Sequence, residues 1–186
     1  MRGVGGDEII RPDLGAERRG ARKEKGSKMN AIRLAGLLIL LAAPVAGQTM
    51  EEARDLMEAG AFEESRKMLE GFARSGNAEA EELIGVHYAL GLGVARDDVR
   101  AFEWYLRASL KGHAGAQSGL GWYYEVGRGT APDPVRAYLW YALSAIGGDV
   151  DAPDSLNELT PKLSVDQKAQ AESLVDDYKV WMYPFR

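Results

Sequence analysis

The strongest constraint on this chain is an internal repeat of 36 residues. When residues 78–113 are aligned with residues 114–149, 14 of the 36 positions are identical. The identical pairs are mainly alanine, glycine and aromatic residues: Ala78/Ala114, Ala80/Ala116, Gly85/Gly121, Tyr88/Tyr124, Gly91/Gly127, Gly93/Gly129, Ala95/Ala131, Asp97/Asp133, Val99/Val135, Arg100/Arg136, Ala101/Ala137, Trp104/Trp140, Tyr105/Tyr141 and Gly112/Gly148. A unit this short cannot bury its own apolar face, so neighbouring units must stack, and about three are needed for a stable fold.

Each copy predicts two helices joined by a turn that contains glycine. In the first copy, apolar residues recur at helical spacing over residues 78–90, and Gly91 ends the helix because glycine readily takes the left-handed conformation of a helix end. A second helix follows over residues 97–111, with Asp97 as its N-cap. The apolar stripes are Ala80, Ile84 and Tyr88 on the first helix and Ala101, Trp104, Tyr105 and Ala108 on the second.

Gly85 and Gly121 lie inside the first helix of each copy, where glycine costs about 1 kcal/mol relative to alanine. A cost that recurs in both copies indicates a common cause. We expect the facing helix to approach so closely at these positions that a Cβ atom does not fit, with small and bulky side chains interlocking across the pair.

Upstream of the two copies, residues 50–77 predict a degenerate third unit with helices over residues 51–59 and 62–74. Its loop is shorter than the loops of the two clear copies. Terminal units are expected to be atypical, because one of their faces meets solvent.

Downstream, residues 150–186 predict a C-terminal cap on the stack. It begins with a short turn or helix over residues 155–163. A last helix is opened by Ser164, which forms a capping-box pattern with Gln167. The apolar segment 181–185 either folds back on this helix, which we favour, or forms an exposed docking segment. The sequence thus predicts an all-α chain of about three repeat units and a C-terminal capping helix.

The first 47 residues predict no part of this stack. Residues 1–28 hold eight Lys or Arg, five Asp or Glu and six Gly with almost no apolar periodicity, so we expect them to be disordered. Residues 29–47 have the pattern of a secretory signal peptide, with a short basic start, a ten-residue apolar run and small residues before Gly47. The apolar run is too short to span a bilayer comfortably, which takes about 20 residues.

The simplest interpretation is that translation starts at Met29 and that residues 1–28 are a mis-called N-terminal extension. Cleavage near Gly47 then delivers residues 48–186 to the periplasm or outside the cell. Two alternatives remain, namely an uncleaved signal anchor and an apolar helix of a soluble protein.

Composition excludes several chemistries. The chain has no cysteine, which rules out disulfides, thiolate metal sites and a cysteine nucleophile. Residues 48–186 carry 14 basic and 23 acidic side chains, which argues against nucleic-acid binding. The two histidines are interpreted as a partly buried ring (His87) and as a linker or cap between the copies (His113). The acidic segment 149–154 lacks the glycine and the glutamate of a calcium loop. We therefore assign no catalytic, metal-binding or cofactor-binding residue.

The residue pattern shared by the two copies resembles the Sel-one-like repeat (SLR), a relative of the tetratricopeptide repeat. The first copy carries it as Ala80, Ile84-Gly85, Tyr88, Gly91, Gly93-Val94, Asp97, Ala101, Trp104-Tyr105 and Gly112. The second copy carries it as Ala116, Leu120-Gly121, Tyr124, Gly127, Gly129, Asp133, Ala137, Trp140-Tyr141 and Gly148. The resemblance extends over about residues 50–181 and implies a right-handed α-solenoid of antiparallel helix pairs.

Members of that family usually act as adaptors that bind other proteins along a concave face. Exported bacterial members resemble scaffolds and regulators of envelope complexes. A branch linked to β-lactam hydrolysis uses a disulfide in each repeat, so its activity is not carried over to a chain without cysteine.

The resemblance implies that the first helix of each pair lines the concave face. The residues predicted to bind a partner there are Glu82, Val86, Ser118, Trp122, Tyr123 and Glu125. Trp122 and Tyr123 are the most suggestive because tryptophan and tyrosine are enriched among binding hot spots. The competing interpretation packs both of them against the neighbouring unit as ordinary core.

We therefore expect an exported, non-catalytic adaptor that binds a protein or peptide, without a cofactor and without nucleic acid. No stable membrane insertion is expected once the signal is cleaved, and the acidic chain favours a basic partner. The alternatives are a cell-envelope enzyme or peptidoglycan-associated factor and a membrane-tethered structural subunit.

Overall fold

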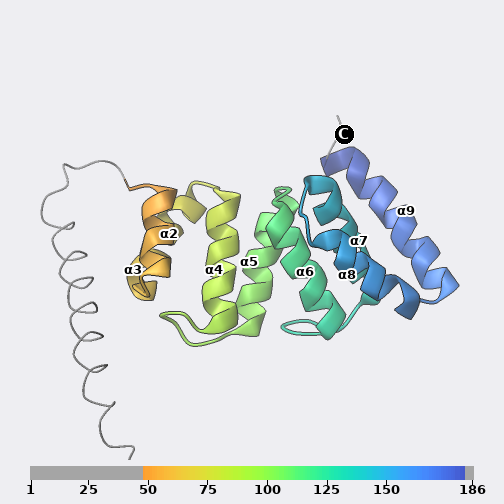
Figure 1. Cartoon of the computed structure of the whole chain (residues 1–186), viewed down its shortest axis with the longest axis horizontal. Helices are drawn as coiled ribbons and strands as arrows, with labels where there is room; N and C mark the ends of the chain where they lie inside the picture. Colours follow the sequence, from red (N-terminus) through yellow and green to blue (C-terminus); the bar gives the residue numbers. More distant parts are fainter. Residues whose placement is uncertain (1–47, 183–186) are drawn as a thin grey trace, which may run out of the picture. The chain divides into compact units, whose positions relative to one another are not determined.

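The computed structural model describes residues 48–182 of the chain (Figure 1). The expectations for residues 1–47 and for most of the segment 181–185 lie outside these residues. The described part of the chain contains helices and no strand, which confirms the all-α prediction. None of its helices combines the length and the apolar character needed to cross a membrane.

The helices pack as consecutive pairs. In chain order they are α2 (Met50–Glu58), α3 (Phe62–Arg74), α4 (Ala78–Leu90), α5 (Asp98–Leu110), α6 (Ala114–Val126), α7 (Pro134–Gly147), α8 (Ala152–Leu159), the 3₁₀ helix η1 (Thr160–Lys162) and α9 (Val165–Met182). Figure 1 shows them side by side in this order, with the most extensive contacts between α4 and α5 and between α6 and α7. This is the predicted α-solenoid of helix pairs. We call α2, α4, α6 and α8 the first helices and α3, α5, α7 and α9 the second helices.

In the two copies, side-chain caps start the second helices and glycines end the first helices, at the predicted positions. The carboxylates of Asp97 and Asp133 cap α5 and α7, each accepting a hydrogen bond of 3.0 Å from the backbone N–H three residues on. Gly91 and Gly127 end α4 and α6 with φ values of 71° and 70°, a conformation that glycine adopts without strain. Local sequence therefore sets the length of each helix.

The C-terminal segment forms one more helix pair. α8 begins at Ala152, earlier than the predicted turn or helix over residues 155–163. Ala152 is fully buried, as are Ala116 and Ala80, which lie 36 and 72 residues before it. α9 begins with the predicted capping box, in which the Ser164 hydroxyl accepts from the backbone N–H of Gln167 at 3.1 Å. The register of the repeat thus continues into a segment in which sequence identity has faded.

Each loop inside a clear copy clasps the unit before it. Gly93 and Gly129 have φ values of 64° and 65°. A Cβ on Gly93 would lie 2.7 Å from the backbone nitrogen of Glu63, and one on Gly129 would collide with the backbone carbonyl of Asp98. Both the backbone conformation and the close approach therefore require glycine. Within the described residues no helix pair precedes α2 and α3. The loop between them therefore has no earlier unit to pack against, and residues 59–61 suffice to join the two helices.

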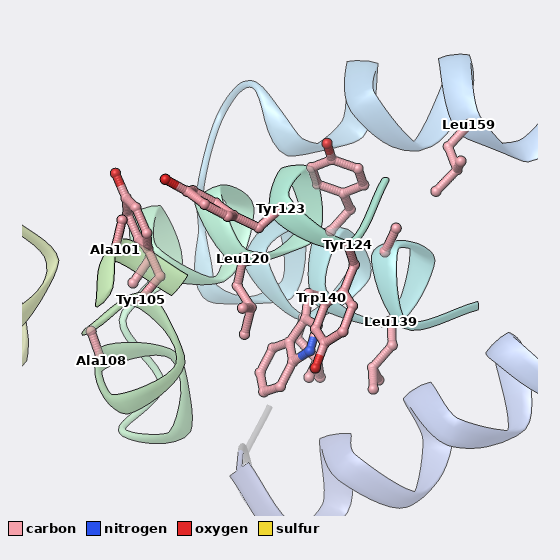
Figure 2. Packing of buried hydrophobic residues seen from close by; sticks show 13 residues of the cluster. Ala101, Tyr105, Ala108, Leu120, Tyr123, Tyr124, Leu139, Trp140 and Leu159 are labelled. Carbon is pink, nitrogen blue, oxygen red and sulfur yellow. The ribbon is translucent and has the colours of Figure 1, made fainter. Parts of the chain in front are cut away.

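Tyrosine rings occupy the space that the helix glycines leave free. A Cβ on Gly85 of α4 would lie 3.3 Å from the ring of Tyr105, and one on Gly119 of α6 would lie 2.8 Å from the same ring. Tyr141 on α7 has the same relation to Gly121, at 2.8 Å. The expected close approach is thus confirmed at Gly121 and is less close at Gly85, and the facing groups are tyrosines. Figure 2 shows Tyr105 among the buried side chains of the main core.

The two repeated tryptophans differ in burial. Trp140 is 4% exposed in the main core, where Tyr178 of α9 packs edge-on against it with the ring centroids 6.2 Å apart. Trp104 is half-buried against the smaller core of the N-terminal helices, and the Arg107 guanidinium lies 4.4 Å from the centre of its ring. Both therefore pack against protein, as the apolar stripe predicts.

The two copies also differ in a buried charge. Glu81 is fully buried, with Oε1 2.7 Å from Nη2 of Arg107 and Oε2 2.7 Å from Nζ of Lys111. The equivalent residue of the second copy is Gln117, also fully buried, whose amide donates to a backbone carbonyl at 3.2 Å. The second copy lacks both the carboxylate and the two cations, so it has no uncompensated buried charge at this position.

His87 is completely buried on α4, deeper than the sequence suggests. Its Nδ1–H donates to the backbone carbonyl of Leu92 at 2.7 Å, and the ring of Phe62 packs edge-on against it. Burial lowers the pKa of the imidazole, and the bond to Leu92 only partly opposes this shift. His87 therefore stabilises the fold in its neutral form.

Three glycine-to-alanine substitutions test the ring packing. Gly71→Ala lies in α3 with no atom within 4 Å of the new Cβ, so its higher helix propensity should raise the free energy of unfolding by about 0.5–1 kcal/mol. Gly121→Ala should lower it by about 1–3 kcal/mol because an aromatic ring must move. Gly85→Ala should fall between the two. Urea denaturation of the full chain measures the order, and equal effects at positions 71 and 121 would contradict the assigned packing.

Protonation of His87 should couple unfolding to pH. The unfolded histidine titrates at about 6.5 and the folded one below that value, so the stabilisation present at neutral pH is lost as the pH falls below about 6.5. In the wild type we expect this contribution to decline by up to about 1.4 kcal/mol per pH unit. His87→Gln removes it, so its stability should fall less steeply between about pH 7 and pH 5. Urea denaturation at a series of pH values measures the free energy of unfolding of both proteins. The same dependence on pH in the wild type and the variant would refute the assignment.

Candidate functional site on the first helices

Residues that lie 36 positions apart occupy equivalent places on α4 and α6, so their outward side chains form rows across the two helices. Val86 and Trp122 form one row, and Leu90 and Val126 form the next, one helical turn further on. Leu90, Trp122 and Val126 are 66%, 39% and 45% exposed, and Val86 is half-buried. We call these four residues the apolar face. Its apolar side chains are grouped, whereas those of ordinary surfaces are scattered singly.

Trp122 is held in place although its ring is exposed. The ring packs edge-on against Tyr123, with centroids 5.3 Å apart, and the Arg128 guanidinium lies 5.4 Å from its centre. Arg128 is in turn fixed by Asp98, at 3.3 Å. A large side chain that is already ordered loses little conformational entropy on binding. Trp122 is therefore a preorganised contact residue.

Tyr123 does not belong to this surface. It is 2% exposed and packs against the rings of Phe102 and Tyr105. Burial raises the pKa of its phenol to about 12. Tyr123 is thus core, as the competing interpretation predicts, and so is His87 at the equivalent position of α4.

Glu82 lies at a joint between two units. Its Oε2 is 3.4 Å from Nδ1 of His113, which also accepts from the backbone N–H of Ala116 and so caps α6. Its Oε1 fills the place that a Cβ on Gly115 would need. Burial raises the pKa of Glu82, and the imidazole of His113 opposes the shift. The interpretation of His113 as a cap between the copies is confirmed.

Glu125 also joins neighbouring units. Its carboxylate accepts from the Tyr141 hydroxyl at 3.1 Å and pairs with Lys162 at 2.8 Å. Burial and the nearby Glu125 carboxylate raise the pKa of Tyr141. Glu125 and Glu82 thus hold the stack together with side chains that are 24% and 21% exposed. Ser118 is half-buried on the same helix face as Trp122, one turn earlier.

Leu90 and Val126 are not among the residues predicted from the sequence to bind a partner. Both stand at the last position of a first helix, directly before the glycine that ends it. The signal that identifies them is that equivalent outward positions are apolar in both copies. Val86, Leu90, Trp122 and Val126 form the only such set that we find on the outward side of α4 and α6 in the described part of the chain.

A separate hollow of about 520 Å³ is lined mainly by the second helices. Its apolar wall includes Leu106, Leu139, Trp140 and Leu174. Two lining residues carry opposite charges and pair with each other, Arg136 with Asp133 at 3.4 Å. Between residues 48 and 182 no three His, Asp or Glu side chains converge as metal ligands would.

The fold and repeat have clear relatives. The family model described as the Sel1 repeat matches residues 78–113 and 114–149. The crystal structure of a Sel1 repeat protein from Oxalobacter formigenes is 34% identical with a TM-score of 0.53, and the match covers 59% of this chain and 85% of that one. The chain belongs to the Sel1 repeat family. The two matched segments coincide with the two copies found by internal alignment.

A second solved structure shares the Sel1 repeat fold. It is c5321, a protective antigen present in uropathogenic Escherichia coli strains that displays an SLR fold. It is 29% identical with a TM-score of 0.67, over 73% of this chain and 30% of the antigen. This chain thus corresponds to less than a third of the antigen's length. No curated protein matches the chain. Sel1 repeat proteins are generally protein-interaction scaffolds and typically non-catalytic.

Proposed function

We propose that this protein is an exported, non-catalytic adaptor that binds a segment of a partner protein through the apolar face of α4 and α6. The observation that carries the proposal is the exposure of apolar side chains at equivalent positions of two adjacent first helices. Folding leaves Leu90, Trp122 and Val126 exposed and Val86 half-buried, while most inward side chains of the same helices are buried. A grouped, exposed apolar surface is typical of a binding site.

Export is proposed from the sequence of residues 29–47. Their basic start, short apolar run and small residues match a secretory signal peptide. We propose that the mature protein begins near Gln48 and resides in the periplasm or outside the cell.

Cell fractionation and mass spectrometry test export. A mature chain beginning near Gln48 in the periplasmic or secreted fraction is expected. A protein that keeps residues 29–47 and sediments with membranes would instead be a tethered subunit.

Binding through the apolar face is tested by photo-crosslinking in cells that express the full chain. A photoreactive residue in place of Val126 should form an adduct with one defined protein. Trp122→Ala should reduce that adduct at least tenfold, as expected for a hot-spot tryptophan. The variant should remain folded, since the ring is 39% exposed.

Leu110→Ala is the matched control. Leu110 is 44% exposed on the second helix α5, where it lines the separate hollow. It should leave the adduct unchanged. An adduct that depends on Leu110 and not on Trp122 would move the binding site to that hollow. Turnover of peptidoglycan fragments by the pure protein would contradict a non-catalytic role.

A further inference from the structure

We propose that the partner segment is basic and amphipathic, with apolar side chains on the apolar face and Lys or Arg side chains against an adjoining row of carboxylates. This inference rests on the proposed function, because it names the chemistry of the partner for the same surface.

Carboxylates lie at the N-terminal ends of the first helices α4 and α8, on either side of α6 in the order of first helices, while the first turn of α6 carries none. Glu79 and Glu82 lie on α4, and Glu82 precedes Val86 of the apolar face by one helical turn. Asp151 and Asp154 occupy the equivalent positions at the start of α8, 72 residues later. We call Glu79, Glu82, Asp151 and Asp154 the acidic edge.

The charge of the acidic edge is only partly compensated. Arg54 pairs with Glu79 at 3.1 Å, and the imidazole of His113 faces Glu82. Within residues 48–182 no Lys or Arg lies at ion-pair distance from Asp151 or Asp154, both of which are exposed. An excess of negative charge therefore remains on this side of the apolar face.

The carboxylates on this side also act on one another. Burial raises the pKa of Glu82, and the nearby carboxylates of Glu79 and Asp149 raise it further. Like charges gathered at a surface destabilise the folded chain, and a cation supplied from outside relieves that repulsion. The site thus has an unmet preference for positive charge.

The other side of the apolar face carries a smaller charge of opposite sign, because two arginines there share one aspartate. Arg96 and Arg128 lie in the loops that follow α4 and α6, and both pair with Asp98, at 3.2 Å and 3.3 Å. Their charge is already neutralised in part. The surface therefore attracts a basic segment and repels anionic ones, and its charge and apolar groups complement an amphipathic peptide with adjacent apolar and basic sides.

The test is a selection of random peptides displayed on phage against the immobilised full-length protein. Enriched peptides should combine aromatic or aliphatic residues with Lys or Arg and should be depleted in Asp and Glu. A synthetic copy of an enriched peptide should bind at least tenfold more weakly to Trp122→Ala. Its affinity should also decrease as the salt concentration rises.

Paired charge variants test the acidic edge itself. Asp151→Asn combined with Asp154→Asn should weaken the binding of that peptide about two- to fivefold for each charge removed. Asp151 makes no side-chain capping bond to α8, so its replacement removes no cap. Asp176→Asn combined with Asp177→Asn, on exposed positions of α9, makes the same change in net charge and should leave the affinity unchanged.

The outcomes separate the two proposals. Enriched peptides that need Trp122 but show no basic bias would overturn this inference and leave the proposed function standing. Equal effects of the two double variants would also overturn it, because they would indicate net charge alone. If no peptide is enriched, or none depends on Trp122, the proposed function fails as well.

Discussion

The stack of helix pairs depends on aromatic rings packed against helix backbones that lack a Cβ atom. Tyr105 of α5 contacts Gly85 in its own unit and Gly119 in the next, so one side chain joins three helices. The fit is tight at both glycines, and a close-packed interior gives little room for other shapes. The positions at this ring–glycine contact are therefore tightly constrained, and the pairs Gly85/Gly121 and Tyr105/Tyr141 are identical.

Outward positions escape this constraint and can vary between units. The apolar face has valine on α4 where it has tryptophan on α6, and Glu82 of α4 is replaced by Ser118. Architecture is thus repeated while the exposed surface differs from unit to unit. This division lets a stack of near-identical hairpins present a specific surface, because specificity depends on the few positions that packing leaves open.

The sequence predicted the helices of the two copies closely because their determinants are local. Apolar stripes, the caps Asp97 and Asp133, and the terminal glycines act within a few residues of one another. α8 was placed too late because only Ala152 and Leu156 preserve the repeat there, and two residues are a weak signal without knowledge of their burial. Ala152 lies one repeat length after Ala116, and this spacing is the signal that identifies the start of α8.

The surface was harder to predict than the fold, since neighbours on a helix point in different directions. Trp122 and Tyr123 look alike as binding residues, yet one is exposed and the other is core. Comparison across units separates them: Tyr123 is equivalent to His87 and Leu159, and all three are buried. Comparing the equivalent positions of all units, before considering side-chain chemistry, shows whether a residue is buried or exposed.

The same comparison explains where the negative charge of the chain is left uncompensated. Buried Glu81 is paired within its own unit by Arg107 and Lys111, and where the second copy has Leu143 and Gly147 instead of these cations it also has Gln117. Charge that folding encloses is therefore balanced unit by unit. No such balance holds beside the apolar face, where Asp151 and Asp154 are exposed and no Lys or Arg within residues 48–182 lies at ion-pair distance from them. Charge is thus paired in the core and left uncompensated beside the apolar face. This difference indicates that the surface binds a group from outside the chain.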